Sequence, residues 1–555
     1  MSQVCILRQH ILIIIALLYV ALAPSTTIGQ SLPAQDLKRY TSDLPFTFPE
    51  IATPQIPDRS FIITSFGAVG DGVHDNTRAI SDAIRECTKS GGGRVVVPQG
   101  MWLTGPIQFE SHLNLVLEKG AVILFSNVLT DYSLVNVPPE GSEYKCISPI
   151  SGINLTDVAI TGEGIIDGAG EAWRPMKKSK YTAQEWKERV ASGGVLSEDG
   201  NMWWPSASAS KGEAYLKQLK KEKKKLSKED YEAARDYLRP NLVKFVQCKN
   251  VLLDGPTFEN SPAWNINPVF CENVIVRNIH IRNEWSAQNG DGIDFKSCRN
   301  VLMADCVVDA GDDGICLKSG RLYPSRALVP CENIVIANCT VYRAHGGFVI
   351  GSTVYGGIMN VSVKNCTFIG TDVGLRFKSS RTRGGIVENI FVDRITMRDI
   401  ENEAIKFEMY YQDAASEQAS TEDRTPQFRK IFMTNIVCIG AKSAGILQGL
   451  PESPLHEITI DGYTATSKLG LQCQDAGGIT LKNLSIKPSE GPAFTFTSCK
   501  DLLLEKSICA PGANPFLRIE GEQNRNIQLV SIDMAPAKKD IEFTGNATPD
   551  AVIRK

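Results

Sequence analysis

A short motif recurs along most of this chain, and it constrains the fold more than any other feature of the sequence. The motif is an asparagine followed by a β-branched residue, and it opens an apolar, strand-like run each time. Successive strong copies are 23, 27, 33, 27 and 29 residues apart. Self-similarity at this length is typical of a solenoid, in which each repeat is one unit stacked on the next. The six strong copies begin at Asn250, Asn273, Asn300, Asn333, Asn360 and Asn389.

The composition of each repeat indicates strands and not helices. Short runs such as Val274–Val276 and Ile334–Ile336 are rich in Val and Ile, are bounded by Gly, Asn and Asp, and lack helical periodicity. A leucine-rich repeat would show Leu at fixed offsets, which these units do not. We therefore predict an all-β solenoid of parallel strands, with a dry core and with asparagine side chains hydrogen-bonded from coil to coil.

Two segments depart from the repeat. The stretch from Asn76 to Cys87 is amphipathic, and we expect a helix there that caps the open end of the solenoid. Residues 171–240 are rich in Trp, Lys and Glu, and Lys211 to Tyr237 is expected to form an exposed charged helix. The predicted organisation is one catalytic β-helix domain over residues 60–540 with a partly helical insertion at 171–240.

The N-terminus has the pattern of a signal peptide. Arg8 precedes thirteen largely apolar residues, Ile11 to Ala23, which end in Ala-Leu-Ala. This run is shorter than the roughly 20 residues that a membrane helix needs. We expect residues 1–23 to be removed, although a cleavage site as late as about residue 30 also fits. The mature chain would then be secreted or periplasmic, without a membrane span.

Charge and cysteine content narrow the classes of partner. The formal net charge is −3, so the chain lacks the basic excess expected of a nucleic-acid binder. None of the 15 cysteines forms a CxxC pair or a Cys/His cluster with zinc spacing. Most are expected to be buried small hydrophobes, with at most a bridge or two. We expect a monomer that uses neither a cofactor nor a metal ion.

Four consecutive repeats align residue by residue near the middle of the chain. In this register Asp291 lies beside Asp313. Residues that are neighbours in this way are about one strand spacing, roughly 4.8 Å, apart. His345 lies beside Asp312 in the same way, so three acids and a histidine share one patch. The aligned segments are Asp291–Ser297, Asp313–Ser319, Gly346–Ser352 and Val373–Ser379.

This crowding indicates chemistry more than folding. Asp-Gly is a common turn dipeptide, so any one of these aspartates alone is more often a turn residue than a catalyst. Three neighbouring carboxylates repel one another, however, which costs stability and raises the pKa of at least one of them. Glycoside hydrolysis needs one carboxyl group that is protonated and another that is ionised. The crowded set supplies both.

Two basic residues suit an acidic substrate. Arg376 and Lys378 are two apart in a predicted strand, so their side chains point to the same face. An Arg can grip a carboxylate through two hydrogen bonds. The alternative is an ion pair with the neighbouring aspartates, and both roles are compatible in the empty enzyme. The pattern favours a carboxylated sugar as substrate.

Together these residues resemble the polygalacturonases, glycoside hydrolase family 28. The resemblance spans roughly residues 60–540 and includes Phe66–Gly72, which is similar to the N-terminal signature of pectin-acting β-helices. Two positions depart from the family pattern, Gly290 for Thr and Ala344 for Gly, and neither removes a functional group. The four family motifs appear as Asn289-Gly290-Asp291, Gly311-Asp312-Asp313, Ala344-His345-Gly346 and Arg376-Phe377-Lys378.

The resemblance implies a right-handed parallel β-helix that hydrolyses α-1,4-galacturonosyl linkages of pectin with inversion, and bacterial members are the most similar. It implies Asp312 as the general acid and Asp291 with Asp313 as the groups that activate water. His345 is implied to tune the acid and contact substrate. The implied substrate-binding residues are Asn289, Arg376, Lys378 and a tyrosine at either Tyr410 or Tyr411.

Three alternatives stay open. The first is a rhamnogalacturonan hydrolase on the same scaffold, and the second is a Ca²⁺-dependent pectate lyase, since clustered aspartates can bind calcium. The third is a β-helix that binds glycans without cutting them. Exo attack is a further hypothesis, because the 171–240 insertion is large enough to wall off one end of the groove. Trp203 and Trp204 would then stack on a terminal sugar, unless they pack in a core.

Overall fold

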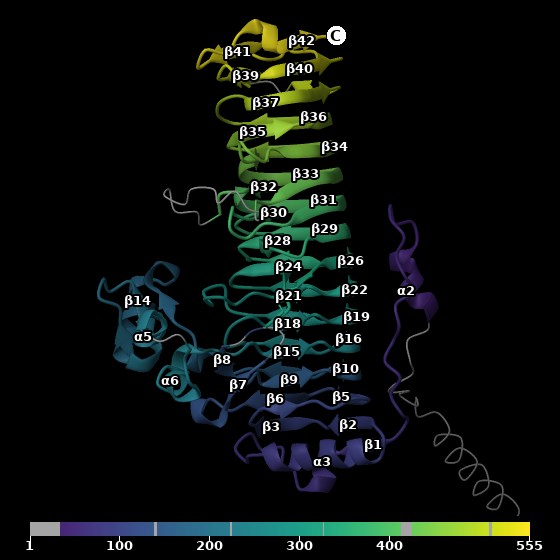
Figure 1. Ribbon diagram of the computed structural model, residues 1–555, viewed down its shortest axis with the longest axis vertical. Coiled ribbons are helices and arrows are strands. Elements are labelled where there is room, and N and C mark those ends of the chain that lie inside the picture. Colours follow the sequence, from purple (N-terminus) through teal and green to yellow (C-terminus); the bar gives the residue numbers. More distant parts are fainter. Residues whose placement is uncertain are drawn as a thin grey trace, which may run out of the picture.

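The computed structural model describes residues 34–137, 141, 143–222, 225–325, 327–411, 425–509 and 513–555. Most of its strands join into one continuous sheet that winds through coils stacked along one axis (Figure 1). The predicted fold class, a right-handed parallel β-helix, is confirmed. The predicted signal peptide, residues 1–23, lies outside the described residues. Within the described ranges no helix is both long and apolar enough to cross a bilayer.

Each coil contributes strands to up to three parallel sheets. The sheet that carries the predicted site is called the site sheet, and it comprises β4 (Ile107–Gln108), β9 (Ile150–Ile153), β15 (Val243–Val246), β18 (Ile266–Val269), β21 (Ile293–Lys296), β24 (Asp313–Arg321), β28 (Gly346–Val354), β30 (Leu375–Lys378) and β32 (Ile405–Glu408). The second sheet runs through β1 (Ser60–Ile62), β2 (Gly93–Val97), β5 (Leu113–Leu117), β10 (Thr156–Gly162), β16 (Lys249–Asp254), β19 (Glu272–Arg277), β22 (Arg299–Ala304), β26 (Cys331–Ala337), β29 (Ile358–Ile369) and β31 (Ile386–Glu403). The third contains β3 (Gly100–Thr104), β6 (Ala121–Phe125), β11 (Ile165–Asp167), β17 (Thr257–Glu259), β20 (His280–Arg282), β23 (Val307–Asp309) and β27 (Thr340–Tyr342).

The repeated asparagines form the predicted ladder. Asn273 Nδ2 donates to Asn250 Oδ1 at 3.0 Å, and each later member donates to the one before it at 3.1 to 3.3 Å. All six have φ near +55°, in the left-handed region that Asn tolerates better than most side chains. The repeat therefore fixes both the turn and the register, because each turn is bonded to its copies above and below.

A substitution within the asparagine ladder tests how much its hydrogen bonds contribute to the stability of the fold. We expect Asn300→Ala to lower the free energy of unfolding by about 2–3 kcal/mol, because it breaks two hydrogen bonds and leaves alanine in a left-handed turn. Denaturant titration measures the loss. Asn546→Ala is the control, since Asn546 has φ of 65° and is exposed outside the ladder. An equal loss in both variants would mean that the ladder bonds add nothing.

The interior of the coils is apolar and stacked. Phe377 and Phe407 lie one above the other with ring centroids 4.3 Å apart and an interplanar angle of 2°. Thirteen cysteines in the described part of the chain are buried, and none of these forms a disulfide. They fill small gaps in the core, as predicted from their apolar surroundings.

The predicted cap is present at the bottom of Figure 1. Helix α3 (Thr77–Lys89) turns Ile80, Ala83 and Ile84 into the core of the first coils. A shorter helix, α2 (Ala34–Thr41), lies against the outside of the second sheet. The upper coils continue through β33 (Gln427–Gln448), β34 (Leu455–Ser467), β35 (Leu469–Gly477), β36 (Thr480–Pro488), β37 (Phe494–Glu505), β39 (Leu517–Glu520), β40 (Arg525–Val530), β41 (Ile541–Thr544) and β42 (Val552–Arg554).

The insertion projects from one side of the β-helix (Figure 1). The prediction of a single helix from Lys211 to Tyr237 is wrong, because the described residues of this stretch form the end of one α-helix, a second short α-helix and a 3-10 helix. Ser227 caps a new helix through its side chain, which accepts from the Asp230 N–H while the Asp230 carboxylate accepts from the Ser227 N–H. The helices and strands of the insertion are β12 (Met176–Lys177), α4 (Ala183–Ala191), β13 (Val195–Leu196), β14 (Met202–Trp204), α5 (Ala207–Glu222) and α6 (Lys228–Glu232).

Candidate active site

The strand register brings the predicted acids together. Ile293 pairs with Ile315, and Phe348 pairs with Leu375, as the sequence alignment of the repeats requires. The alignment fails only at its end, where Ser319 pairs with Val354 because β28 carries an irregularity. The register of the site sheet is thus confirmed over the residues that matter for the site.

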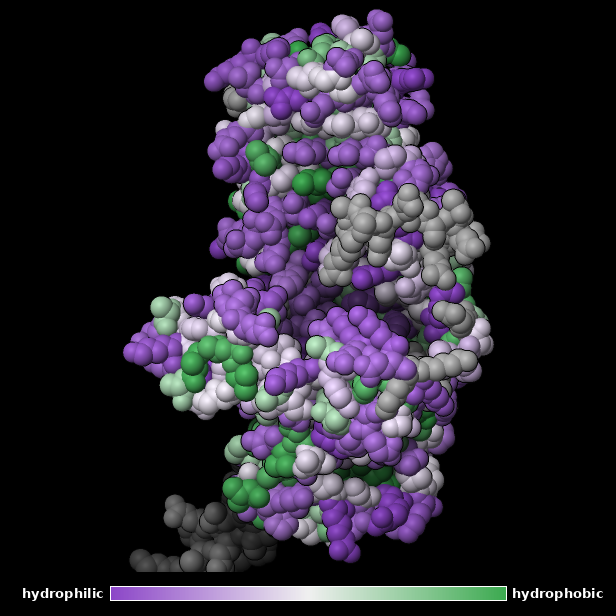
Figure 2. All heavy atoms as spheres, turned by 60° about the vertical axis from the view of Figure 1, so that its left-hand side comes forward, coloured by the Kyte–Doolittle hydropathy of each residue, from purple (hydrophilic) through white to green (hydrophobic). Residues whose placement is uncertain are grey.

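Three carboxyl groups meet on the outer face of the site sheet. Oxygens of Asp291, Asp312 and Asp313 all lie within 4.8 Å of one another. Asp291 and Asp313 are each 3% exposed, and Asp312 is half-buried. Figure 2 shows a hollow lined by hydrophilic residues at this height of the β-helix, next to the insertion. Asp312 is therefore the member of the cluster that is most open to solvent.

The surroundings of Asp291 and Asp312 shift the pKa values of these two carboxyl groups in opposite directions. Burial raises the pKa of Asp291 well above its usual value, and the charges of Asp294 and Asp312 raise it further. Burial also raises the pKa of Asp312, but the hydrogen bond and charge of His345 outweigh it and lower that pKa to about 2. His345 Nδ1 lies 3.1 Å from Asp312 Oδ1. Of these two carboxyl groups, Asp291 therefore holds a proton more readily than Asp312.

This raised pKa makes Asp291 a source of instability that grows with pH. A carboxyl group with a higher pKa in the folded state destabilises the fold as pH rises above its unfolded value of about 4. We expect Asp291→Asn to be more stable than wild type at pH 7, by about 1–2 kcal/mol, with the difference shrinking toward pH 4. Thermal unfolding across this pH range measures it. A difference that is constant with pH would contradict the ionisation argument.

The two predicted cations lie beside the acids. Lys378 Nζ donates to both oxygens of Asp313, at 2.7 and 3.1 Å, and is 4% exposed. Arg376 lies 3.8 Å from the same carboxylate and donates to the His345 carbonyl at 3.3 Å. The ion pair considered from the sequence is present, and the side chain of Arg376 is still 15% exposed.

The structure separates the two tyrosines that the sequence left undecided. The ring of Tyr411 lies under both Lys378, at 5.0 Å, and Arg376, at 5.6 Å. Tyr410 instead lies under Arg381 at 4.9 Å and packs against the core. Tyr411 is therefore the tyrosine that shares the site with the two cations.

Sequence reasoning missed a buried charge pair beneath the cluster. Lys318 forms an ion pair with Asp294, which is 0% exposed, and its Nζ lies 3.7 Å from Asp291 Oδ2. The same ammonium lies 4.6 Å above the ring of Trp264. The signal was available, since strand alternation puts Lys318 on the same outer face as Asp294 of the preceding coil.

Residues of the insertion form hydrogen bonds with the loop that precedes Asp291. Arg239 donates to the Asn289 side-chain oxygen at 2.9 Å and to the Gln288 carbonyl at 2.8 Å. Tyr181 lies within hydrogen-bond distance of Ser286, at 2.8 Å. Asn289, predicted from the sequence as a substrate-binding residue, is thus positioned by a residue of the insertion.

The tryptophans of the insertion have different surroundings. Trp203 is 6% exposed and packs with Met176 and Trp186 in a small separate core, so stacking of Trp203 on a sugar is ruled out in this arrangement. Trp204 is half-buried. Trp285, which lies outside the insertion and six residues before Asp291 in the chain, is 43% exposed and has Lys180 4.8 Å from its ring.

A parallel β-helix with three clustered carboxyl groups and adjacent cations on one sheet defines the class of the protein as a β-helical glycoside hydrolase. The chain belongs to glycosyl hydrolases family 28, whose family model matches residues 177–477. Residues 60–122 match a second model, rhamnogalacturonase A/epimerase, pectate lyase-like.

Known relatives agree with this family. The chain is 28% identical over 457 residues to "Probable polygalacturonase" of Vitis vinifera, covering 78% of this chain and 81% of the relative. It is also 28% identical to "Exo-poly-alpha-D-galacturonosidase" of Dickeya chrysanthemi, covering 66% of this chain and only 58% of that protein. A hyperthermoactive exopolygalacturonase structure from Thermotoga maritima matches with a TM-score of 0.64 and 30% identity, over 79% of this chain and 94% of the other.

Proposed function

We propose that the protein hydrolyses α-1,4-galacturonosyl linkages of pectin or polygalacturonate. The observation that carries the proposal is the carboxyl cluster of Asp291, Asp312 and Asp313 next to Arg376 and Lys378. The acids supply the proton and the base that glycoside cleavage needs. The cations supply partners for the carboxylate that distinguishes galacturonate from a neutral sugar.

We assign Asp312 as the general acid and Asp291 with Asp313 as the groups that orient and deprotonate water. The opposite pKa shifts favour a proton on Asp291 and an ionised Asp312 before substrate binds. Because the three groups lie within 4.8 Å, substrate binding can move this proton onto Asp312. Asp312 then donates to the departing oxygen, and ionised Asp291 takes a proton from water.

The stereochemical outcome needs a separate argument. Inverting enzymes usually separate their carboxyl groups by roughly 6.5–9.5 Å, and retaining enzymes by roughly 5–5.5 Å. The distances within this cluster resemble the second class. A covalent intermediate, however, needs a carboxylate oxygen that reaches the anomeric carbon, whereas Lys378 engages both oxygens of Asp313 and Asp291 is only 3% exposed. We therefore propose attack by water and inversion.

A time course of products from polygalacturonate tests the proposed function. The expected result is release of new reducing ends whose anomeric carbon, followed by NMR, is first in the β configuration. An α product would overturn inversion, and cleavage of rhamnogalacturonan alone would establish the rival hydrolase.

The lyase alternative makes a different chemical prediction. It requires unsaturated, ultraviolet-absorbing products and loss of activity with a chelator. We favour hydrolysis because the ammonium groups of Lys378 and Lys318 already lie 2.7 and 3.7 Å from the acids, where they repel a divalent cation. EDTA is therefore expected to leave activity unchanged.

We further propose exo attack by an exported monomer. Three side chains of the insertion, those of Arg174, Tyr181 and Arg239, contact the loop that precedes Asp291. These contacts narrow one end of the site. The exposed ring of Trp285 offers a stacking surface there. Early release of single galacturonate units or of digalacturonate supports exo attack, whereas a ladder of intermediate oligomers contradicts it.

The proposals of export and of a monomeric state have separate tests. N-terminal sequencing of secreted protein tests the signal peptide, and gel filtration tests the oligomeric state.

A further inference from the structure

Arg239, near the end of the insertion, holds two loops that border the catalytic acids. Its guanidinium donates to the carbonyl oxygens of Pro262 at 3.1 Å and Gln288 at 2.8 Å, and to Asn289 Oδ1 at 2.9 Å. Pro262 lies shortly before strand β18, and Gln288 lies shortly before Asp291 and strand β21. Since β18 and β21 are paired, one side chain ties together the loops that lead into two neighbouring strands of the site sheet.

The surroundings of Arg239 are costly for a cation. Burial lowers the pKa of Arg239 to about 10, and the charge of Arg174 lowers it further. The charges of Asp291 and Asp312 act in the opposite direction, so the guanidinium is close enough to both acids to interact with them. Two neighbouring cations in a buried place destabilise a fold, and a role at the active site explains this arrangement better than folding alone.

The contact with Arg239 fixes which way the amide of Asn289 points. Arginine has N–H donors and no acceptor, so the amide atom that faces it has to be the oxygen. The NH₂ group therefore lies on the opposite side of the planar amide. Because Asn289 is exposed, this group can donate to an oxygen of a bound substrate. Arg239 thus makes Asn289 a donor toward substrate and not an acceptor.

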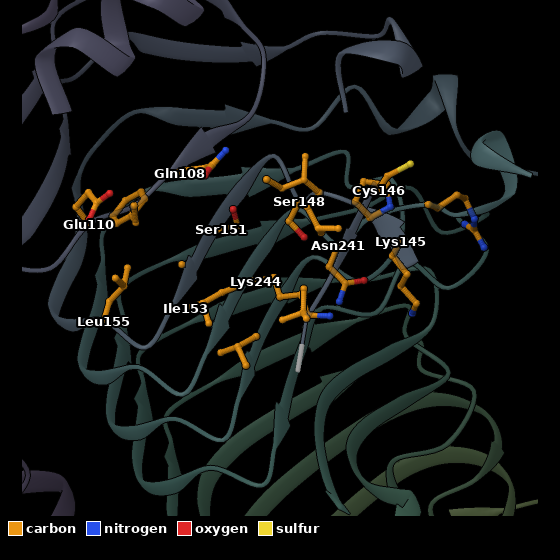
Figure 3. Close-up of a pocket in the computed structure, with 18 residues that line it drawn as sticks. Gln108, Glu110, Lys145, Cys146, Ser148, Ser151, Ile153, Leu155, Asn241 and Lys244 are labelled. Atoms are coloured by element: carbon orange, nitrogen blue, oxygen red, sulfur yellow. The ribbon is translucent and has the colours of Figure 1, made fainter. Parts of the chain in front are cut away.

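Arg239 also lines an open pocket with a volume of about 320 Å³. Figure 3 shows this pocket, with Asn241 and Lys244, which follow Arg239 in the chain, labelled at its wall. An open volume provides no side chains that could pack against the loop in place of Arg239. A shorter side chain at residue 239 would therefore leave Gln288 and Asn289 without this support.

We propose that Arg239 is a positioning residue for the hydrolysis, which holds Asn289 as a hydrogen-bond donor toward the substrate and fixes the loop that precedes Asp291. This inference rests on the proposed function for the reaction. It makes the end of the insertion part of the active site without requiring that Arg239 touch the sugar. A donor at residue 289 suits the carboxylate of galacturonate, whereas an acceptor there would repel it.

Replacing Arg239 tests the effect on catalysis. We expect R239M to lower kcat/KM on polygalacturonate by about 10²-fold, because a misplacement of catalytic groups by about 1 Å has an effect of this size. The control is R235M, since Arg235 belongs to the same insertion, has a side chain that is 17% exposed, and has Glu232 and the Tyr132 carbonyl as partners. R235M should match wild type in activity. Equal losses of activity in R239M and R235M would overturn the proposal.

The variant N289D tests the same arrangement with Arg239 intact, and it separates a donor role of Asn289 from a role in holding the loop. The aspartate can still accept from Arg239, now as an ion pair, so thermal stability should not fall. Its oxygens cannot donate and they repel the substrate carboxylate, so KM on polygalacturonate should rise about tenfold. Circular dichroism confirms that each variant is folded. Kinetics of N289D equal to those of wild type would contradict the donor assignment.

A double-mutant cycle shows whether Arg239 acts through Asn289. If it does, R239M/N289A should lose no more activity than R239M alone. Losses that multiply would mean that the two residues act independently, which refutes the positioning role. The same cycle measured by denaturant titration reports the contact without turnover, and the two substitutions are expected to be non-additive there as well.

These outcomes are distinct from failure of the proposed function. If wild type releases no reducing ends from polygalacturonate, the proposed function fails, while the unfolding cycle still tests the contact between Arg239 and Asn289. If wild type cleaves the polymer but R239M behaves like R235M, only the role of Arg239 is refuted.

Discussion

Replacing Asp312 by asparagine is expected to lower kcat on polygalacturonate by about 10²- to 10⁴-fold, the usual contribution of a general acid. KM should change little, because Asn keeps the shape and much of the hydrogen bonding of Asp. Steady-state kinetics on the polymer measures the loss. Asp309→Asn is the control, since Asp309 pairs with Arg343 on the next turn, outside the cluster.

A substrate with a good leaving group separates the roles of the acids. An aryl α-galacturonide whose phenol leaves without protonation needs no general acid, so Asp312→Asn should recover most of its activity on that substrate. Asp291→Asn should not recover, because activation of water is still missing. The opposite pattern would reverse the two assignments and would agree with the raised pKa of Asp291.

The features that the sequence predicted correctly are those that repeat. The asparagine ladder and the alternation of apolar residues set the coil, and the coil sets which side chains are neighbours. For this reason Asp291, Asp313 and Arg376 could be placed together from an alignment of repeats. The cap at Thr77–Lys89 was also predictable, because an amphipathic helix needs a surface to cover and the open end of a solenoid provides one.

The features that it did not predict depend on single local contacts. The break in the insertion follows from one capping serine, Ser227, within a lysine-rich stretch that otherwise suits a helix. The choice of Tyr411 over Tyr410 depends on which way a chain turns after a strand. The raised pKa of Asp291 depends mainly on how deeply its carboxyl group is buried and on the charge of Asp294 beside it, and neither the burial nor this contact is encoded in a motif.

The buried pair of Lys318 and Asp294 gives the second large expected effect. Lys318→Met should destabilise the fold by about 3–5 kcal/mol, because it leaves the Asp294 carboxylate buried without its partner. Activity should fall by about 10²-fold, because Lys318 also lowers the pKa of Asp291, which must ionise to activate water. Denaturant titration and steady-state kinetics measure the two losses.

The double variant D294N/K318M separates stability from catalysis. Replacing both charges removes the unpaired carboxylate, so the variant should regain most of the lost stability. Its activity should stay low at neutral pH and improve at higher pH, because without Lys318 the pKa of Asp291 rises and the acid limb of the pH profile moves up. The matched control is D254N/R277M, which removes an ion pair with a 2.9 Å contact away from the acids. If D294N/K318M regained activity together with stability, and its pH profile matched wild type, Lys318 would be a structural residue only.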